Sequence, residues 1–552
     1  MNDFLHAIKA WRETIGSQNV ITEGAALESA QTATFSTTQR IPAIIRPGSF
    51  EEVQQCVRIA NEFKIPIYPV SLGKNWGFGS RVPVQTCCVV MELRRLNRIL
   101  DYSEDLAYVT IEPGVTFQQL YEYLCGKGSN LFMSLTGSSS NTSLIGNALE
   151  RGVGSGPYGD RFNHVCGLEV VLPTGECIHS GMERFPNAKT GKLFRWGAGP
   201  SIDGLFAQSN FGIVTKMSLW LLPRPRHFQT FFFHLRDASR LPALVNALRS
   251  LKLGEPLKVQ LGLMNDYRVI SFTGQYPWQE AGGKTPLPLA IKERVKKEKR
   301  IPAWHGTGAL YSANSRLGRA GRELIKEILQ PQVDRLIFID AFKARVSRYI
   351  NVPYRLLTGI NLKKFMEFAY NNTPFLGVPL GEAGGVTMTY WRKKNPPPED
   401  VDPDRDRCGI IWLNPTVPLE GREVQEAVRI IEDVSLSHGF EPNLGVRLVR
   451  ERTADINAAI VFDREAPGED ERAMACHDLM LDRLIKAGYY PCRLGIQSMN
   501  ALPQPQDDFS CFHRALKQAL DPNEILAPER YQFGETAQSG LNTASPLAGI
   551  IE

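Results

Sequence analysis

The spacing of apolar residues changes along the chain. In residues 1–20 they recur every three or four positions, so that Phe4, Ile8, Trp11 and Ile15 fall roughly on one face, which predicts an amphipathic helix. From Ile41 onward, helical periodicity alternates with short continuous apolar runs of the kind that form buried strands. This alternation predicts an α/β domain.

The segment 46–63 predicts the first helix of that domain. Ser49 stands where a capping side chain belongs, and Glu51 and Glu52 follow in the first turn, where acidic groups suit the positive end of a helix. The same reading along the chain predicts strands at 65–70, 87–93 and 107–115 and a helix at 116–124.

A second group of strands begins near residue 167. The turn at 173–176 predicts a β-hairpin, and the strand at 212–222 ends at Pro223 and Pro225, which mark a boundary. Beyond it, strands and helices are mixed with long polar loops rich in proline, glycine and charge. The sequence therefore predicts an α+β fold in three parts, at 1–227, 228–490 and 491–552.

Composition is that of an ordinary globular protein, and its length exceeds what one hydrophobic core usually serves. The chain has 552 residues, of which 43% are hydrophobic and 22% charged. The net charge of +5 is spread along the chain and gives no reason to expect nucleic acid as a partner. The densest basic run, 292–300, alternates with Glu293 and Glu298 and predicts a solvated helix or loop.

Targeting and cysteine patterns point to a soluble, reduced protein. No run of about 18 apolar residues exists, so no membrane span is predicted. Residues 1–13 lack the apolar core of an export signal, which predicts a cytoplasmic protein with reduced thiols, including Cys87 and Cys88 in a buried strand. No cysteine or histidine group has metal-ligand spacing, so no metal is predicted.

Three glycine-rich segments are the candidates for chemistry, at 69–80, 144–176 and 195–221. In the first, a strand runs into a turn with Gly73, Gly77 and Gly79, whose backbone N–H groups could face one concavity and cradle a diphosphate. It is not the dinucleotide fingerprint, because the spacing differs and no helix pattern follows. Each segment taken alone also fits an ordinary glycine-rich loop.

Taken together and in this order, the three segments resemble the flavin domain of the vanillyl-alcohol oxidase and p-cresol methylhydroxylase family. The resemblance covers residues 40–225, with "GNALERGVGSGPYGD" and "WGAGPSIDGLFAQSNFGIVTKMSLWLLP" as its most specific motifs. It returns at "GYYPCRLGI" and "DPNEILAPER". The resemblance implies a two-part FAD-binding domain at 1–227 and 491–552, a cap domain at 228–490 that covers the flavin ring, and a homo-oligomer.

The resemblance also implies a set of FAD-binding residues from the glycine-rich segments and the C-terminal motif. They are Pro69, Ser71, Leu72, Gly73, Lys74, Asn75, Gly77, Ser138, Gly146, Asn147, Gly152, Gly156, Tyr158, Gly159, Gly212, Ile213, Val214 and Arg493. His164, near these segments, is either an active-site group or a histidine satisfied at the start of a strand.

The catalytic positions depart from the phenol-oxidising members of the family. Those members bind a phenolate with two tyrosines and an arginine, whereas this chain keeps Arg493 but has Phe78 and Cys492 at the tyrosine positions. Ser138 stands where the family has an aspartate near flavin N5. Arg493, Cys492 and Ser138 are therefore the predicted catalytic residues, and Cys492 either shapes the pocket or contacts the substrate.

Covalent attachment of the flavin is not expected. Some family members tether FAD through a histidine or tyrosine in the strand matched by "RCGIIWLNP", where this chain has neither and Ile410 falls near the expected place. The resemblance therefore implies non-covalent FAD. Phe78, Trp412 and Ile410 are predicted to form the apolar walls of the substrate pocket. Arg493 either binds a carboxylate or another oxyanion of the substrate with its forked donors, or belongs to a structural ion pair.

Three functions remain open from the sequence. The first is an FAD-dependent oxidoreductase that takes hydride from an alcohol or activated C–H group of a small aromatic or unsaturated molecule, with O₂ or an electron-carrier protein as the acceptor. The second keeps FAD but acts on a carboxylate-bearing substrate such as a 2-hydroxy acid, or performs an oxidative cyclisation. The third is a non-catalytic protein that retains the fold.

Overall fold

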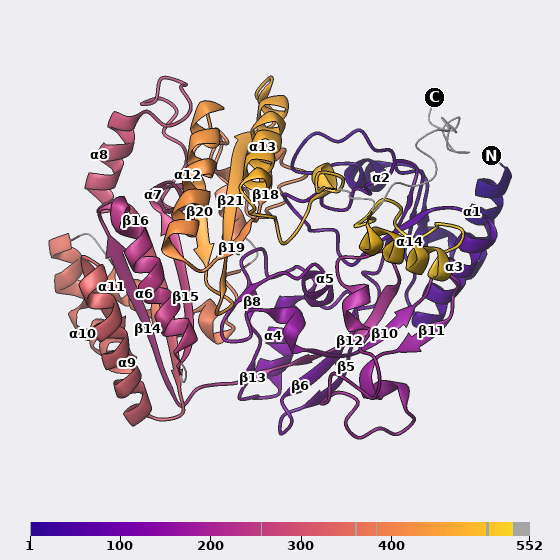
Figure 1. Ribbon diagram of the computed structural model, residues 1–552, viewed down its shortest axis with the longest axis horizontal. Coiled ribbons are helices and arrows are strands. Elements are labelled where there is room, and N and C mark those ends of the chain that lie inside the picture. Colours follow the sequence, from indigo (N-terminus) through magenta and orange to yellow (C-terminus); the bar gives the residue numbers. More distant parts are fainter. Residues whose placement is uncertain are drawn as a thin grey trace.

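A computed structural model describes residues 2–254, 257–358, 361–371, 373–381, 384–503 and 507–533. The described residues form three larger sheets, of four, five and eight strands, together with two short strand pairs. Figure 1 shows the five-stranded sheet at one end of the molecule and the eight-stranded sheet at the other. The predicted α+β class is confirmed.

The four-stranded sheet has the order β1-β2-β4-β3, with β2, β3 and β4 parallel. Helices α1 and α3 cover it, and the indole N–H of Trp11 donates to the carbonyl of Cys56 at 3.1 Å. The predicted N-terminal helix and its buried face are confirmed. The elements of this part are α1 (Asn2–Ile15), β1 (Val20–Ile21), α2 (Ala25–Ala30), β2 (Ile44–Ile45), α3 (Phe50–Glu62), β3 (Ile67–Val70) and β4 (Val89–Glu92).

The five-stranded sheet is antiparallel, in the order β11-β10-β12-β6-β5. Ser49 caps α3 and Thr116 caps α4, and the predicted hairpin joins β10 to β11. This part contains β5 (Ile99–Ser103), β6 (Tyr108–Ile111), α4 (Phe117–Gly126), β7 (Leu131–Phe132), β8 (Leu135–Thr136), α5 (Leu144–Leu149), β9 (Gly154–Ser155), β10 (Val165–Val171), β11 (Cys177–His179), β12 (Ile213–Trp220) and β13 (Leu222–Pro223).

The eight-stranded sheet begins with β14 and has the order β17-β14-β16-β15-β20-β21-β18, with β19 paired to β21. Helices α6, α9, α12 and α13 share one hydrophobic core with it. Its strands are β14 (His227–Leu235), β15 (Lys258–Asn265), β16 (Trp304–Ser312), β17 (Arg335–Ile339), β18 (Cys408–Leu413), β19 (Thr416–Pro418), β20 (Asn443–Arg447) and β21 (Thr453–Asp463).

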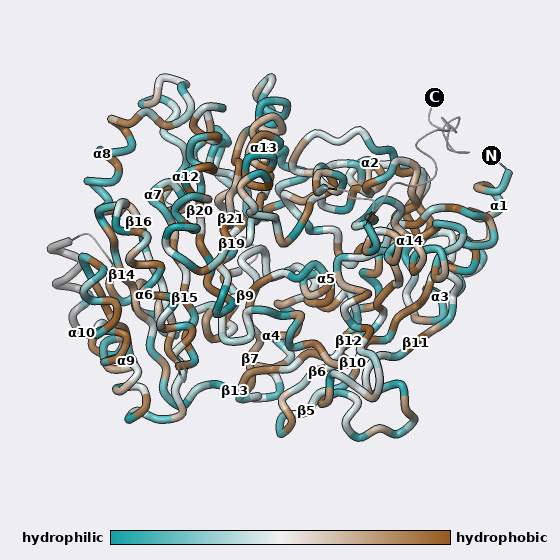
Figure 2. Tube along the Cα trace, in the orientation of Figure 1, coloured by the Kyte–Doolittle hydropathy of each residue, from teal (hydrophilic) through white to brown (hydrophobic). Residues whose placement is uncertain are grey.

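The helices of this part are α6 (Leu241–Leu253), α7 (Asp266–Phe272), α8 (Leu289–Lys299), α9 (Ser315–Leu329), α10 (Ala341–Thr358), α11 (Leu362–Met366), α12 (Gly421–Ser437) and α13 (Glu469–Lys486). The basic run predicted to be solvated forms most of α8, which has no buried residue. Figure 2 shows hydrophobic segments concentrated along the strands and a hydrophilic α8 on the outside.

The C-terminal segment crosses back from the eight-stranded sheet to the first one. After α14 (Asp508–Leu520), Leu526 forms a parallel bridge with Ile67 of β3. The ammonium of Lys517 lies 2.6 Å from the carboxylate of Asp521 and donates to the carbonyls of Asn210 and Leu526. This buried pair fixes the returning segment against the first two sheets.

Two further observations concern the whole described chain. Each of the ten cysteines is a free thiol, and Cys87 and Cys88 are buried as expected. Among the described residues, no helix is long and apolar enough to cross a membrane.

Candidate active site

A cavity of about 350 Å³ lies where the three sheets meet, within the size range of ligand and cofactor sites. Its walls come from the loop after β3, the loops around α5, the segment before β12, the inner edge of the eight-stranded sheet and the C-terminal segment. Each of the three glycine-rich segments contributes to these walls. Contributions from sequence positions this far apart make the cavity a product of the tertiary fold.

The loop after β3 forms one wall with Ser71, Leu72, Gly73, Lys74 and Asn75. Gly73, Gly77 and Gly79 all have positive φ values, of 68°, 82° and 110°, which a side chain would disfavour. These conformations let the chain turn sharply beside the cavity, and the amide of Gly77 donates to Thr34 Oγ1 at 2.9 Å.

A second wall is formed around α5. Ser143 caps this helix, and a methyl group at Gly146 would come within 3.0 Å of the hydroxyl of Ser71, so the two loops lie in close contact. Arg161 is 1% exposed, donates to the carbonyls of Ser134 and Gly152, and also bonds to Asn147. Arg161 therefore holds this wall together from behind.

Three buried polar atoms of uncharged side chains in the cavity wall have no hydrogen-bond partner among the described residues. They are Ser209 Oγ, Asn210 Oδ1 and Asn414 Oδ1. Buried polar atoms are nearly always hydrogen-bonded in native proteins. Their position therefore suits a bound molecule with several polar groups.

Arg493, the predicted substrate-binding residue, lines the cavity but is engaged by the protein. Its guanidinium lies 3.3 Å from the carboxylate of Glu150, donates to Asn75 and lies 4.2 Å from the centre of the Phe78 ring. Glu150 is also paired with Arg530. Arg493 thus takes part in an ion-pair network that links the C-terminal motif to the loop after β3.

The other predicted catalytic residues also lie in the walls. Burial raises the pKa of the Cys492 thiol, so this residue is a neutral thiol near pH 7 rather than a nucleophilic thiolate. Ser138 lines the cavity beside Gly385, and Ile410 and Trp412 line it from β18. The predicted substrate-pocket residues are therefore brought together.

The predicted cofactor residues Pro69, Gly152, Gly212, Ile213 and Val214 line the cavity as well.

Four predicted cofactor residues lie outside the cavity walls and support them from behind. Gly77 packs under Trp412, and Tyr158 stacks on His164 with ring centres 3.7 Å apart. Gly159 accepts a hydrogen bond from Gly154, and Gly156 packs against Ser134. His164 also bonds through Nδ1 to the carbonyl of Asp160, which matches the expectation of a satisfied histidine.

Two arginines of the cavity were not anticipated from the sequence. Arg268 projects from α7, is 7% exposed, and donates to the amide oxygen of Asn443 at 3.2 Å. Its guanidinium lies 5.4 Å from the centre of the Trp412 ring. Burial lowers the pKa of Arg268 to about 9, and the positive charge of Arg447 acts in the same direction.

Arg447 ends β20 and faces the same cavity. Among the described residues, no hydrogen bond or ion pair engages its guanidinium, and no carboxylate lies within 4.0 Å of Arg268. Asp455, opposite Arg447 on β21, is already bonded to Arg450 and Thr416, each at 2.9 Å. The cavity therefore contains two guanidinium groups that no carboxylate of the described residues contacts.

The local sequence around these two arginines contains only a weak indication that they face a binding site. Arg447 ends a buried strand and Arg268 lies two residues into a short helix. Whether such a side chain points to solvent or inward depends on which elements pack around it, and a single sequence does not give that.

Comparison with known proteins identifies the class to which this protein belongs. A model of the FAD binding domain family matches residues 41–181. The chain is 50% identical over 96% of its length to 1'-carboxy-chondrochloren decarboxylase of Chondromyces crocatus, of which it covers 97%. It is 29% identical over 96% of its length to the 4-cresol dehydrogenase (hydroxylating) flavoprotein subunit of Pseudomonas putida, of which it covers 95%.

Among solved structures, p-cresol methylhydroxylase with substrate bound superposes with a TM-score of 0.85 at 26% identity, covering 97% of this chain and 98% of that one. These similarities define an FAD-dependent oxidoreductase rather than a non-catalytic protein. The chain belongs to the vanillyl-alcohol oxidase and p-cresol methylhydroxylase family.

The residues of the cavity fit the expected cofactor. The loop after β3 lines the cavity with Ser71, Gly73, Lys74 and Asn75, and it turns at Gly73, whose φ is 68°. The unpartnered Ser209 and Asn210 offer polar atoms to a ligand with many acceptors and donors. Arg493 and Arg530 outnumber Glu150, so the local charge suits a diphosphate.

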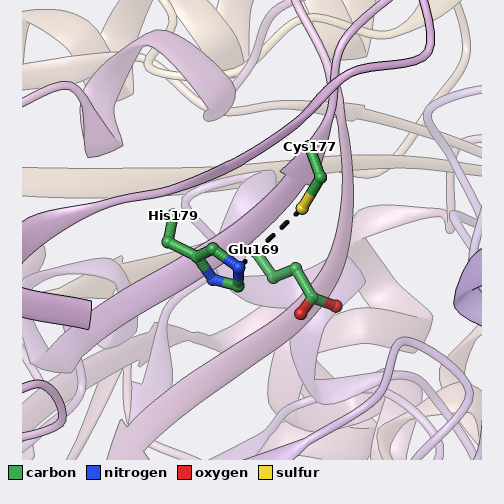
Figure 3. A group of neighbouring side chains, drawn as sticks. All are labelled: Glu169, Cys177 and His179. Atoms are coloured by element: carbon green, nitrogen blue, oxygen red, sulfur yellow. Dashed lines mark hydrogen bonds between the residues drawn. The ribbon is translucent and has the colours of Figure 1, made fainter. Parts of the chain in front are cut away.

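A separate group of possible metal ligands lies on the hairpin β10–β11, where Glu169, Cys177 and His179 face one another (Figure 3). Cys177 Sγ lies 3.9 Å from His179 Nε2. The carboxylate of Glu169, however, accepts from Lys216 at 2.8 Å and from Thr215 at 3.0 Å. An ammonium at this distance opposes a divalent cation, so we assign no metal to this group.

Proposed function

We propose that this enzyme oxidatively decarboxylates a small carboxylate-bearing substrate, with FAD as the electron acceptor. The observation that carries the proposal is the pair of guanidinium groups of Arg268 and Arg447 in the cavity, without a carboxylate partner among the described residues. Buried charges in native proteins are normally paired. A substrate carboxylate would supply the missing partner through charge-assisted, forked hydrogen bonds.

The remaining walls define the rest of the substrate. Trp412 and Phe272 flank Arg268 with aromatic faces, and Ile410 and Met388 add apolar surface. Phe78 and Cys492 offer no hydroxyl donors to a phenolate, so activation of a phenol as in the phenol-oxidising relatives is disfavoured. We therefore infer an aryl or unsaturated acid as the substrate class.

The reaction class follows from the relative and from the balance of electrons. The relative from Chondromyces crocatus is named 1'-carboxy-chondrochloren decarboxylase, and it matches nearly the whole chain. FAD supplies a two-electron acceptor for a hydride when it is bound. If the hydride leaves the carbon next to the one that bears the carboxylate, the electrons of the C–CO₂ bond can form a C=C bond and CO₂ leaves.

The residues of the chain would contribute binding and orientation. Arg268 and Arg447 would hold the carboxylate so that the C–CO₂ bond is perpendicular to the plane of the developing double bond. The stacking of Arg268 on Trp412 would restrict the motion of its guanidinium group. No proton need be taken from the substrate, which agrees with the neutral Cys492 and with Ser138 in place of an acid.

A simpler oxidation of a 2-hydroxy acid is the second candidate, because the same arginine pair would hold its carboxylate. In that reaction the carboxylate stays on the product. The two candidates therefore differ in whether CO₂ is released.

We also propose that FAD is held without a covalent bond. The strand β18 carries neither histidine nor tyrosine, and Ile410, fully buried in the cavity wall, cannot form such a bond.

The test is to reduce the holoenzyme without oxygen, using a panel of 3-arylpropanoic acids, aryl-substituted 2-hydroxy acids and their methyl esters. Flavin bleaching measures the electrons transferred, and trapped CO₂ measures decarboxylation. One CO₂ per reduced flavin supports the proposal, and flavin reduction without CO₂ supports the second candidate. Methyl esters that reduce the flavin as fast as the free acids would contradict both, because an ester offers no charge to the arginines.

A further inference from the structure

A carboxylic acid from the cap domain reaches into the back of the FAD-binding loop. Asp404 lies in the segment before β18 and is 3% exposed. One of its oxygens accepts from the indole N–H of Trp76 at 3.1 Å, and the other accepts from the hydroxyl of Ser80 at 2.7 Å. Trp76 and Ser80 both line the cavity and lie at the two ends of the glycine-containing turn that follows Asn75.

We propose that Asp404 is a positioning residue for FAD. Its two hydrogen bonds, to Trp76 and Ser80, form a link between the cap domain and the turn 76–80 that we call the clasp. The clasp holds this turn and the adjoining diphosphate-binding residues in the conformation that binds FAD. The inference rests on the FAD site and is independent of the proposed substrate. No local sequence motif predicts the contact between Asp404 and Trp76, because the two residues are 328 positions apart in the sequence.

Contacts from outside the turn help to hold it because two of its residues are glycines. Gly77 and Gly79 adopt positive φ values, and glycine loses more conformational freedom on ordering than any other residue. The middle of the turn is fixed by backbone bonds, from Gly77 N–H to Thr34 Oγ1 at 2.9 Å and from Ile496 N–H to the carbonyl of Phe78 at 3.0 Å. The side chains at its two ends are fixed by Asp404.

Protonation of Asp404 should modulate this clasp. Burial, with the nearby charge of Asp402, raises the pKa of Asp404 to about 7, while Ser80, Arg81 and Trp76 act in the opposite direction. Asp404 is therefore largely neutral in mildly acidic solution and ionised in mildly alkaline solution.

The other charges around Asp404 are largely balanced within the protein. Arg81 shares the buried carboxylate of Glu92 with Arg46 and Arg94. On the loop that carries Asp404, Asp406 is paired with Arg405 at 2.8 Å and accepts from Tyr390 at 2.5 Å, and Arg405 also pairs with Asp400. The ammonium of Lys74 lies 5.7 Å from the ring centre of Trp76, on the loop itself.

The direction of the pH effect follows from charge. Ionised Asp404 places a negative charge behind the loop that receives the diphosphate of FAD, which is itself an anion. FAD binding therefore favours the neutral carboxyl, and by linkage its affinity falls as pH rises through the pKa of Asp404.

The experiment measures the rate at which FAD leaves the holoenzyme after dilution, by the rise of flavin fluorescence between pH 6 and pH 8.5. Asp404→Ala leaves the Trp76 N–H without its acceptor and should release FAD roughly tenfold faster than wild type at pH 6. Asp404→Asn imitates the neutral carboxyl, so it should release FAD at the wild-type rate at pH 6 and remain slow at pH 8.5, where wild type releases it faster.

The matched control is Asp400→Asn, the same substitution on an exposed carboxylate of the same loop, which should follow wild type at every pH. An Asp404→Asn variant with the same pH profile as wild type would overturn the proposal. So would flavin that stays with acid-precipitated protein, because a covalent bond rather than the clasp would then retain it.

Discussion

Replacing Arg447 by methionine should weaken substrate binding strongly while leaving the protein at least as stable. Methionine keeps most of the side-chain volume and removes only the charged donors. Arg447 has no hydrogen bond or ion pair to another described residue, so its removal strands no buried anion. Burial lowers the pKa of Arg447, which means that the folded protein disfavours its charge, so the free energy of unfolding should stay the same or rise.

The loss of binding can be estimated from the contacts expected. A hydrogen bond to a charged group contributes about 1.5–3 kcal/mol, which corresponds to roughly a 10- to 150-fold rise in the dissociation constant of the acid. The assay is anaerobic stopped-flow reduction of the flavin over a range of substrate concentrations, which separates the dissociation constant from the rate of hydride transfer. Thermal unfolding of the same preparations gives the stability.

Arg450→Met is the matched control, three residues further along the chain. Its guanidinium pairs with Asp160 and Asp455, each at 2.9 Å, so its loss leaves two carboxylates without their partner and should lower the melting temperature. The reasoning is refuted if Arg447→Met binds the acid as tightly as wild type, or if it unfolds at the lower temperature expected of Arg450→Met.

The remaining predictions concern the cofactor site and its supports. Gly77→Ala should lose about 2–4 kcal/mol of stability and most of its FAD, because the added methyl would stand 2.1 Å from Trp412 at a positive φ; the flavin absorbance of the purified variant checks this. Lys517→Met leaves buried Asp521 unpaired and should destabilise the protein by about 3–5 kcal/mol, seen in urea unfolding, whereas an unchanged midpoint would show that the pair is dispensable. Because the pKa of Asp404 is raised from 3.8 to about 7, wild type should lose stability as pH rises between those values. The melting temperature of Asp404→Asn should therefore rise relative to that of wild type over the same interval. Parallel curves of melting temperature against pH for the two proteins would contradict the shift. Acid precipitation should leave the yellow flavin in the supernatant, and a yellow pellet would show a covalent bond.

Much of the FAD-binding part could be predicted from the sequence, because its signals are local. Ser49 and Thr116 begin helices wherever the rest of the chain lies, since capping involves only the next turn. The glycines at 73, 77 and 79 mark a loop that needs positive φ, and this need is a property of the backbone itself. The periodicity of Phe4, Ile8 and Trp11 was sufficient to place the first helix and its buried face.

The active site depended on the tertiary structure, because its residues meet only when the three sheets pack together. Arg493 was predicted from its motif, yet only the fold shows that Glu150 and Asn75 engage it. Arg268 and Arg447 carry no local signal, and the packing of α7 beside β20 turns both toward one cavity. The sequence by itself thus determined the class of protein and its cofactor, since helix caps, glycine turns and motifs act over a few residues. The packing of distant segments decided which charges are paired by the protein and which remain for a substrate.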